Sequence, residues 1–122
     1  PAGPDVTKPA LVPNAATTAV TAGTSLALSS SATDTRFNQS NGKETTQAIA
    51  GAEYYIDVPP WKTGAVAKPL NAADGSFNST TEGLSGTIST TGLSVGKHMV
   101  FVRARDASGA WGPITAEFIQ IK

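Results

Sequence analysis

The chain of 122 residues contains no cysteine and a single histidine, His98. The absence of cysteine excludes disulfides, thiolate catalysis and cysteine-ligated zinc. Any histidine-dependent catalysis or metal binding has to use His98, and a lone histidine has neither a second metal ligand nor an obvious nucleophile beside it. We therefore predict no catalytic residue and no cofactor, and the chain is not expected to be an enzyme.

Charged side chains are also scarce. They make up 15% of the sequence, nine basic and nine acidic, against about 25% in a typical domain. No run of like charge occurs, which argues against a nucleic-acid partner, because such proteins carry a basic patch for phosphate contacts. No apolar run approaches the length of a membrane span. The amino-acid composition, rich in Ser and Thr and poor in Lys, favours a secreted or cell-surface protein.

The length corresponds to one domain with one core. Pro1, Pro4, Pro9 and Pro13 fall within the first thirteen residues, and proline-rich stretches are stiff and extended. We predict a proline-rich linker or extended N-terminal segment over 1–9 and a single domain over 10–122. The opening letters PAGPDVTKPA are typical of a segment taken from within a longer chain.

Beyond the N-terminus the hydrophobic pattern has a period of two, which indicates strands. Leu26 and Leu28 share one face with Ser30 and Ala32. In AEYYID the alternation places Ala52, Tyr54 and Ile56 on one face and Glu53, Tyr55 and Asp57 on the other. Pro59 and Pro60 end that strand, because neither can donate to a ladder.

The clearest strand lies in GKHMVFVRARD. Here His98, Val100, Val102 and Ala104 are predicted to point inward, because the alternate face carries two arginines. In the last strand, ITAEFIQIK, Phe118 competes with Ile119 and Ile121 for the inward face. Six to eight short strands separated by turn signals predict an all-β, immunoglobulin-like β-sandwich of about seven strands.

Four stretches resemble the bacterial immunoglobulin-like or fibronectin-III-like modules that accompany secreted hydrolases, including zinc carboxypeptidase-like and other extracellular peptidases. They are GTSLALSSSATD (23–34), AEYYIDVPPW (52–61), AADGSFNSTTE (72–82) and GLSVGKHMVFVRARDASGAWGP (92–113). The resemblance covers about residues 10–122, and Ala110 departs from the Asn that such modules carry in the corner.

This resemblance implies a non-catalytic accessory module, a spacer or docking domain of a larger secreted bacterial protein whose expected activity is that of a hydrolase. Its partner is then the neighbouring domain of the same polypeptide. The alternative is a binding module for polysaccharide or for an insoluble protein such as collagen.

The corner after the strongest strand has two interpretations. Asp106, Ser108 and Gly109 are typical turn residues, because Asp bonds nearby backbone N–H groups and Gly accepts positive φ. Alternatively, Asp34 and Asp106 meet at one end of the sandwich and hold calcium with loop carbonyls. DGSFN faintly resembles a calcium loop through Asp74, Ser76 and Asn78 but lacks the distal acid.

A candidate partner surface comprises Tyr55, Phe101, Arg103 and Trp61. If their strands pair, Tyr55 and Phe101 form an exposed apolar strip beside Arg103, and exposed aromatics in a row suggest a partner contact. The alternative is that arginine side chains cover these rings. Trp61, on a loop after two prolines, and Trp111 are candidate platforms for a sugar. Asn38 and Asn78 begin glycosylation sequons, which are chance matches in a bacterial protein.

Overall fold

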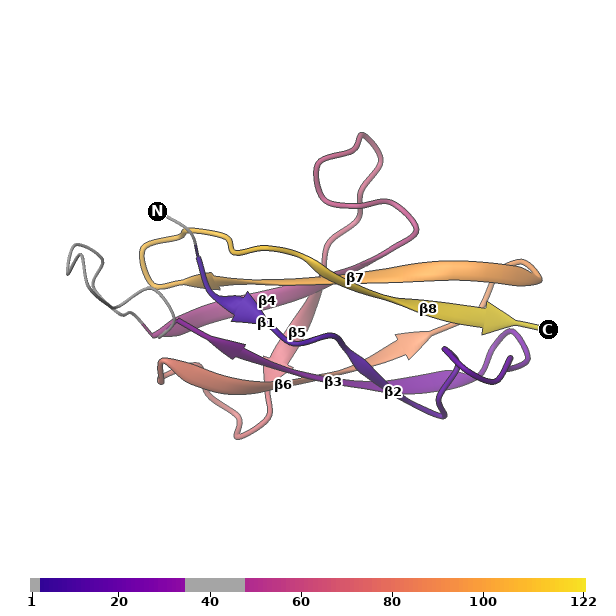
Figure 1. The fold of residues 1–122 in the computed structure, drawn as a ribbon, viewed down its shortest axis with the longest axis horizontal. Helices are drawn as coiled ribbons and strands as arrows, with labels where there is room; N and C mark the ends of the chain where they lie inside the picture. The colour runs from indigo at the N-terminus through magenta and orange to yellow at the C-terminus, as the bar shows by residue number, and fades with distance from the viewer. Residues whose placement is uncertain (1–2, 35–47) are drawn as a thin grey trace.

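The structure is a computed structural model that describes residues 3–34 and 48–122. Eight strands and no helix occur in these two ranges (Figure 1). The strands are β1 (Asp5–Val6), β2 (Ala10–Val12), β3 (Ser25–Thr33), β4 (Ile49–Ile56), β5 (Lys68–Ala72), β6 (Thr81–Ser89), β7 (Gly96–Asp106) and β8 (Thr115–Ile121). The prediction of an all-β fold is confirmed. The predicted turn at Asn41 and Gly42 lies outside the described residues.

The strands follow the order β1-β3-β6-β5-β4-β7-β8 with antiparallel neighbours, and β2 also pairs with β3. Strand β5 changes partner along its length. Lys68, Pro69 and Leu70 pair with β4, whereas Asn71 and Ala72 pair with β6. It thereby joins one layer, containing β3 and β6, to a second layer containing β4, β7 and β8 (Figure 1).

The core lies between these layers and follows the predicted alternation. Leu26 and Leu28 on β3 and Val100 and Val102 on β7 are at most 2% exposed. The hydroxyl of Tyr54 on β4 donates to the carbonyl of Thr87 on β6 at 3.2 Å, which links the two layers.

The facing of the last strand is settled by its burial. Ile119 and Ile121 are 0% and 3% exposed, whereas Phe118 between them is 41% exposed. Ile119 pairs with His98 across β7 and β8, so the two isoleucines share the inward face of that ladder.

The N-terminal segment packs against the strands of the domain from Gly3 onward, and its backbone is extended. Pro4 is fully buried, and Val6 pairs with β3 and joins the core at 8% exposure. Further along, the Ala15 carbonyl accepts from the Gln120 N–H of β8 at 2.9 Å. The segment thus bonds to β3, which would be an edge strand without it, and then to the edge strand β8. Its extended backbone supplies the donors and acceptors that each edge needs.

Candidate functional site

The outer face of β4 and β7 carries an ion pair between Glu53 and Arg103. The Arg103 Nε and one terminal nitrogen donate to Glu53 Oε2 at 3.0 and 2.8 Å, and the same nitrogen donates to the Tyr55 hydroxyl at 3.0 Å. The Tyr55 hydroxyl also donates to Glu53. The Arg103 guanidinium lies 4.0 Å from the ring centroid of Trp111 and 5.6 Å from that of Tyr55. Arg103 therefore holds two aromatic rings and one carboxylate together.

This network corrects the exposed strip predicted for Tyr55 and Phe101. The two residues pair across β4 and β7 as predicted, but Tyr55 is only 4% exposed and Phe101 is half-buried. Alternation placed Tyr55 on the outer face correctly. Its ring is nevertheless removed from solvent, and burial is the leading cause that raises the pKa of its hydroxyl. For the Tyr55 ring, the contacts of Arg103 support the alternative interpretation, in which an arginine side chain covers the ring.

Trp61, the remaining member of the candidate partner surface, is 71% exposed. It lies in the connection between β4 and β5, which projects from the body of the domain (Figure 1). Val66 on the same connection is 62% exposed. The connection begins at Asp57, which has a φ of +65°, a conformation that Asp tolerates better than most residues.

His98 stands between Asp57 and Ser94 at the base of that connection. Its Nδ1 is 2.6 Å from Asp57 Oδ2, and its Nε2 is 2.8 Å from the Ser94 carbonyl oxygen and 3.4 Å from the Ser94 hydroxyl. The bond to the carbonyl joins the His98 side chain to the backbone four residues earlier. Sequence reasoning missed Asp57, which is 41 residues away along the chain.

Ser94, His98 and Asp57 have the composition of a hydrolytic triad, but their geometry does not activate the serine. A general base needs a free lone pair on Nε2 directed at the hydroxyl. Here the closer partner of Nε2 is a carbonyl oxygen, which only accepts, so Nε2 has to carry a proton. Asp57, followed by the Ser94 carbonyl, raises the pKa of His98 by hydrogen bonding. The arrangement favours an imidazolium that donates from both nitrogens.

This arrangement predicts that stability depends on pH. The folded pKa of His98 is raised above its ordinary value, so its contribution is complete below the unfolded pKa and is lost as pH rises through the folded pKa. As pH rises from about 6 into the range above the ordinary histidine pKa, we expect the free energy of unfolding to fall by up to about 1 kcal/mol, the range of partly exposed ion pairs. Urea denaturation across this range measures it.

Two variants serve as controls for the pH experiment. Asp57→Asn removes the charge and retains a residue that tolerates positive φ, and His98→Gln removes the only histidine. Both should flatten the profile. A wild-type profile that is already flat would contradict the prediction.

Asp106 ends β7 and organises the corner that follows. Its Oδ1 accepts from the Ser108 N–H at 2.9 Å, the Ser108 hydroxyl at 2.6 Å and the Ala110 N–H at 3.1 Å. Burial alone would raise the pKa of Asp106, but these bonds and one from Gly109 outweigh it and lower the pKa. The turn interpretation is therefore confirmed, with Gly109 at a φ of +90°. The next strand begins only at Thr115, after an isolated bridge between Arg105 and Trp111.

The proposed calcium pair of Asp34 and Asp106 remains a prediction. Within residues 3–34 and 48–122, no group of three His, Cys, Asp or Glu side chains is arranged to hold a metal. Asp74, in the fainter calcium-loop pattern, accepts from the Ser76 N–H at 3.2 Å and forms an ordinary turn.

Glu82 is a buried carboxylate that sequence reasoning did not identify as structural. It is 3% exposed, and its Oε2 accepts from the backbone N–H groups of Asn78 and Ser79 at 2.7 and 2.9 Å. Glu82 thus fixes the turn that precedes β6. The other sequon residue, Asn38, lies outside the described residues.

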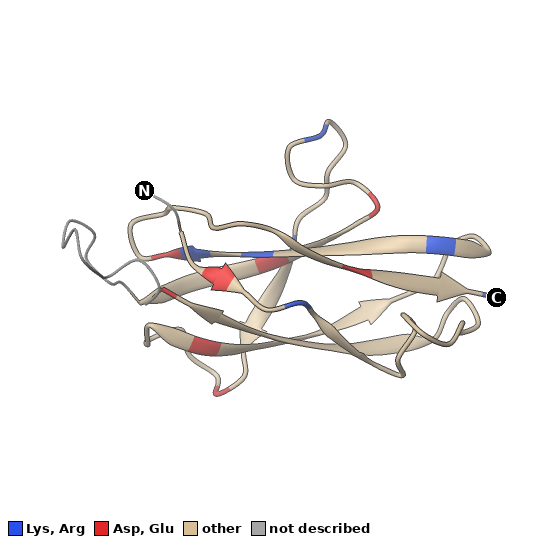
Figure 2. Ribbon diagram, in the orientation of Figure 1, with Lys and Arg blue, Asp and Glu red and all other residues tan. Residues whose placement is uncertain are grey.

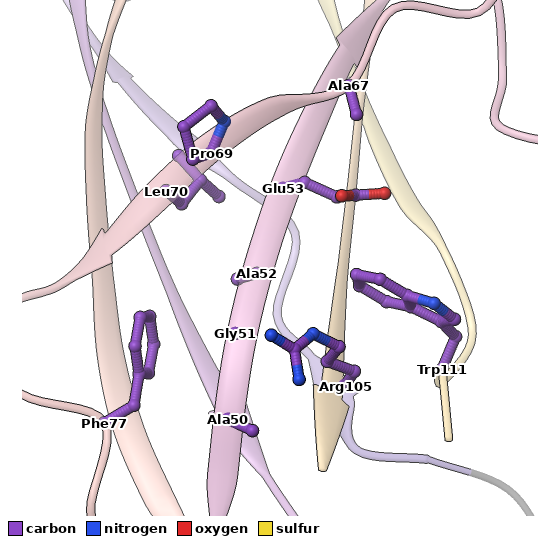
Figure 3. A pocket seen from close by; sticks show the side chains of 10 residues that line it. All are labelled: Ala50, Gly51, Ala52, Glu53, Ala67, Pro69, Leu70, Phe77, Arg105 and Trp111. Atoms are coloured by element: carbon purple, nitrogen blue, oxygen red, sulfur yellow. The ribbon is translucent and has the colours of Figure 1, made fainter. Parts of the chain in front are cut away.

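A groove of about 430 Å³ crosses β4 where β5 departs toward β6. Its floor consists of Ala50, Gly51 and Ala52 (Figure 3). Pro69, Leu70 and Phe77 lie along one side of this floor, and Glu53, Arg105 and Trp111 lie along the other (Figure 3). Small side chains and a change of strand partner together leave this part of β4 uncovered.

Charges elsewhere on the described chain form no patch of one sign (Figure 2), and β3 and β6 carry no Lys or Arg and a single acid, Glu82. Among the residues that the structure describes, no helix is long and apolar enough to cross a membrane. No family model matches the chain, and no curated protein matches it.

Proposed function

We propose that the chain is an immunoglobulin-like module of the fibronectin-III-like type that acts as a non-catalytic spacer or docking domain in a larger secreted bacterial protein, with a hydrolase as its neighbour. The observation that carries the proposal is that Gly3 and Ile121, near the two ends of the described chain, lie beside opposite ends of β7. The layers joined by β5 and the corner at Asp106 support the fold assignment.

The separation of the ends follows from the pairing of β7. Gly3 bonds to the Trp111 carbonyl beside Arg105, whereas Ile121 pairs with Gly96 at the other end of β7. The backbone between Gly96 and Arg105 spans about 30 Å at the usual rise of about 3.3 Å per residue. A domain entered at one end and left at the other sets a fixed distance between its neighbours.

Energy transfer between dyes on two introduced cysteines tests this role, and the cysteine-free sequence simplifies the labelling. The pair Asp5→Cys and Lys122→Cys should report a separation of about 25 Å that holds until the domain unfolds in urea. The matched pair Asp5→Cys and Ala107→Cys, with Ala107 exposed directly after β7, should transfer much more efficiently. Equal transfer in both pairs would remove the basis for a spacer.

Activity assays on the wild-type chain test the non-catalytic part of the proposal. The isolated chain should not hydrolyse activated esters, peptides or glycosides. Turnover that disappears in both Ser94→Ala and His98→Ala would overturn it, because those two side chains would then form a working nucleophile and base.

A binding module for polysaccharide or insoluble protein is the second candidate, and the exposed Trp61 on the projecting connection favours it. Aromatic faces supply stacking surface for sugars and anchors for protein surfaces. Retention on cellulose, chitin or collagen that Trp61→Ala removes and Phe118→Ala retains would favour binding. If the chain is retained on none of cellulose, chitin and collagen, the result favours the spacer role.

A further inference from the structure

The groove over Gly51 combines apolar walls with a cation that has no acidic partner. Glu53, the acid on its rim, is already bound by Arg103 through two bonds. Among the described residues the side chain of Arg105 makes no hydrogen bond or ion pair, and its guanidinium lies 6.0 Å from the Trp111 ring centroid. The groove therefore carries one uncompensated positive charge.

Gly51 determines how Arg105 lies in the groove. A Cβ at this position would stand 3.1 Å from Arg105 Nε and 3.2 Å from one terminal nitrogen. The guanidinium thus lies against the bare backbone of β4, and Figure 3 shows it directed over the floor. A shift in register between Ile49 and Gly51 accompanies this approach.

The polar groups that line the groove indicate which class of ligand it fits. A sugar needs several directional donors and acceptors, whereas this groove offers one free charged side chain among Phe77, Trp111, Pro69 and Leu70. Arginine binds carboxylates through two parallel N–H bonds. A volume of about 430 Å³ is at the lower end of ordinary ligand sites and fits one or two amino-acid residues.

We propose that this groove binds the C-terminal residue of a peptide, with its free carboxylate on Arg105 and its apolar side chain between Phe77 and Trp111. The site is separate from the spacer role, which requires no ligand, and from the connection that carries Trp61. Failure of one leaves the other standing, because the dye-separation experiment does not involve the groove.

Titration of the ¹⁵N-labelled chain with acetyl-Gly-Leu-Phe tests the proposal. The indole N–H resonance of Trp111 should shift while that of Trp61 stays, which provides an internal reference. The peptide amide, which lacks the carboxylate, should bind at least about ten-fold more weakly, because a bond to a charged partner is lost. Equal affinity for acid and amide, or no shift at about 10 mM peptide, would overturn the proposal.

Two variants with the same change in charge locate the carboxylate. Arg105→Gln should weaken binding of the free acid at least about ten-fold and leave the amide unchanged. Lys62→Gln, on the exposed connection, should leave both unchanged. Resonances away from the groove report whether Arg105→Gln remains folded. In case they move, Gly51→Ala provides a second variant, because its Cβ displaces the guanidinium.

An acidic sugar provides the competing arm. Digalacturonate carries carboxylates without an apolar side chain. If it shifts the Trp111 resonance at lower concentration than the peptide, and Arg105→Gln removes that shift, the site recognises uronates and the peptide proposal is wrong.

Discussion

Replacing Ile119 by alanine is expected to lower the free energy of unfolding by about 3 kcal/mol, the middle of the range for deletion of a buried isoleucine side chain. Ile119 is 0% exposed and lies in the core between the two layers. The substitution removes apolar contact and leaves a cavity that a strand held in a ladder on β7 fills poorly. Urea denaturation, with a slope unchanged from wild type, measures the loss.

Phe118→Ala is the matched control for Ile119→Ala. Phe118 is the adjacent residue on β8, is 41% exposed, and has the Lys97 ammonium 4.9 Å from its ring centroid. Its removal should cost about 1 kcal/mol or less, because much of the ring already contacts water. A larger loss for Phe118→Ala would mean that β8 is one residue out of register, since such a slip exchanges its faces.

The inward faces of the long strands were predictable because alternation is a local property. Val100 and Val102 on β7, and Leu26 and Leu28 on β3, lie where the period of two places them. In the last strand Phe118 and Ile119 are both apolar, so the pattern alone left two parities open. The pairing of β8 with β7 determines which face of β8 points inward, and that pairing cannot be inferred from the sequence of β8 alone.

Tyr55 illustrates a second limit, because facing outward differs from being exposed. The sequence places Tyr55 beside Arg103 once β4 and β7 pair, but burial of the ring depends on the direction of the guanidinium. That direction is fixed by Glu53 and Trp111. Side-chain networks of this kind arise from several elements at once and leave no periodic signal.

The groove and the His98 cluster were unpredictable for the same reason. The groove exists because β5 leaves β4 after Leu70 and pairs with β6. The His98 cluster requires Asp57 from the far end of β4. Both depend on which strands become neighbours, whereas the corner at Asp106 depends on residues within four positions and was correctly predicted.

The N-terminal segment was predicted as a linker or an extended stretch, and only its extended character was visible from its prolines. Its attachment depends on Gly112, which lies against Gly3 and Pro4. A Cβ on Gly112 would overlap the Pro4 carbonyl oxygen and stand 2.9 Å from the Gly3 carbonyl carbon. The backbone of Gly112 is not in the left-handed region, so this close approach, rather than φ, is what requires glycine.

Gly112→Ala is accordingly expected to destabilise the domain by about 3 kcal/mol, near the upper end of the cost of inserting a methyl group into a packed site. Neither backbone can move aside without loss. The Gly3 N–H would leave the Trp111 carbonyl, 3.2 Å away, and the buried Pro4 and Val6 would be drawn toward solvent. Thermal and urea denaturation of the full chain measure the effect.

A shortened chain that begins at Asp5 shows whether the clash is with Gly3 and Pro4. This chain should be less stable than the full one, but Gly112→Ala should cost it less than about 0.5 kcal/mol, because the opposing backbone is gone. An equal cost in both chains would place the role of Gly112 within its own turn. The attachment of the N-terminal segment, on which the spacer role rests, would then depend on the Gly3 bond to Trp111, the buried Pro4 and the pairing of β1, and not on the absence of a side chain at Gly112.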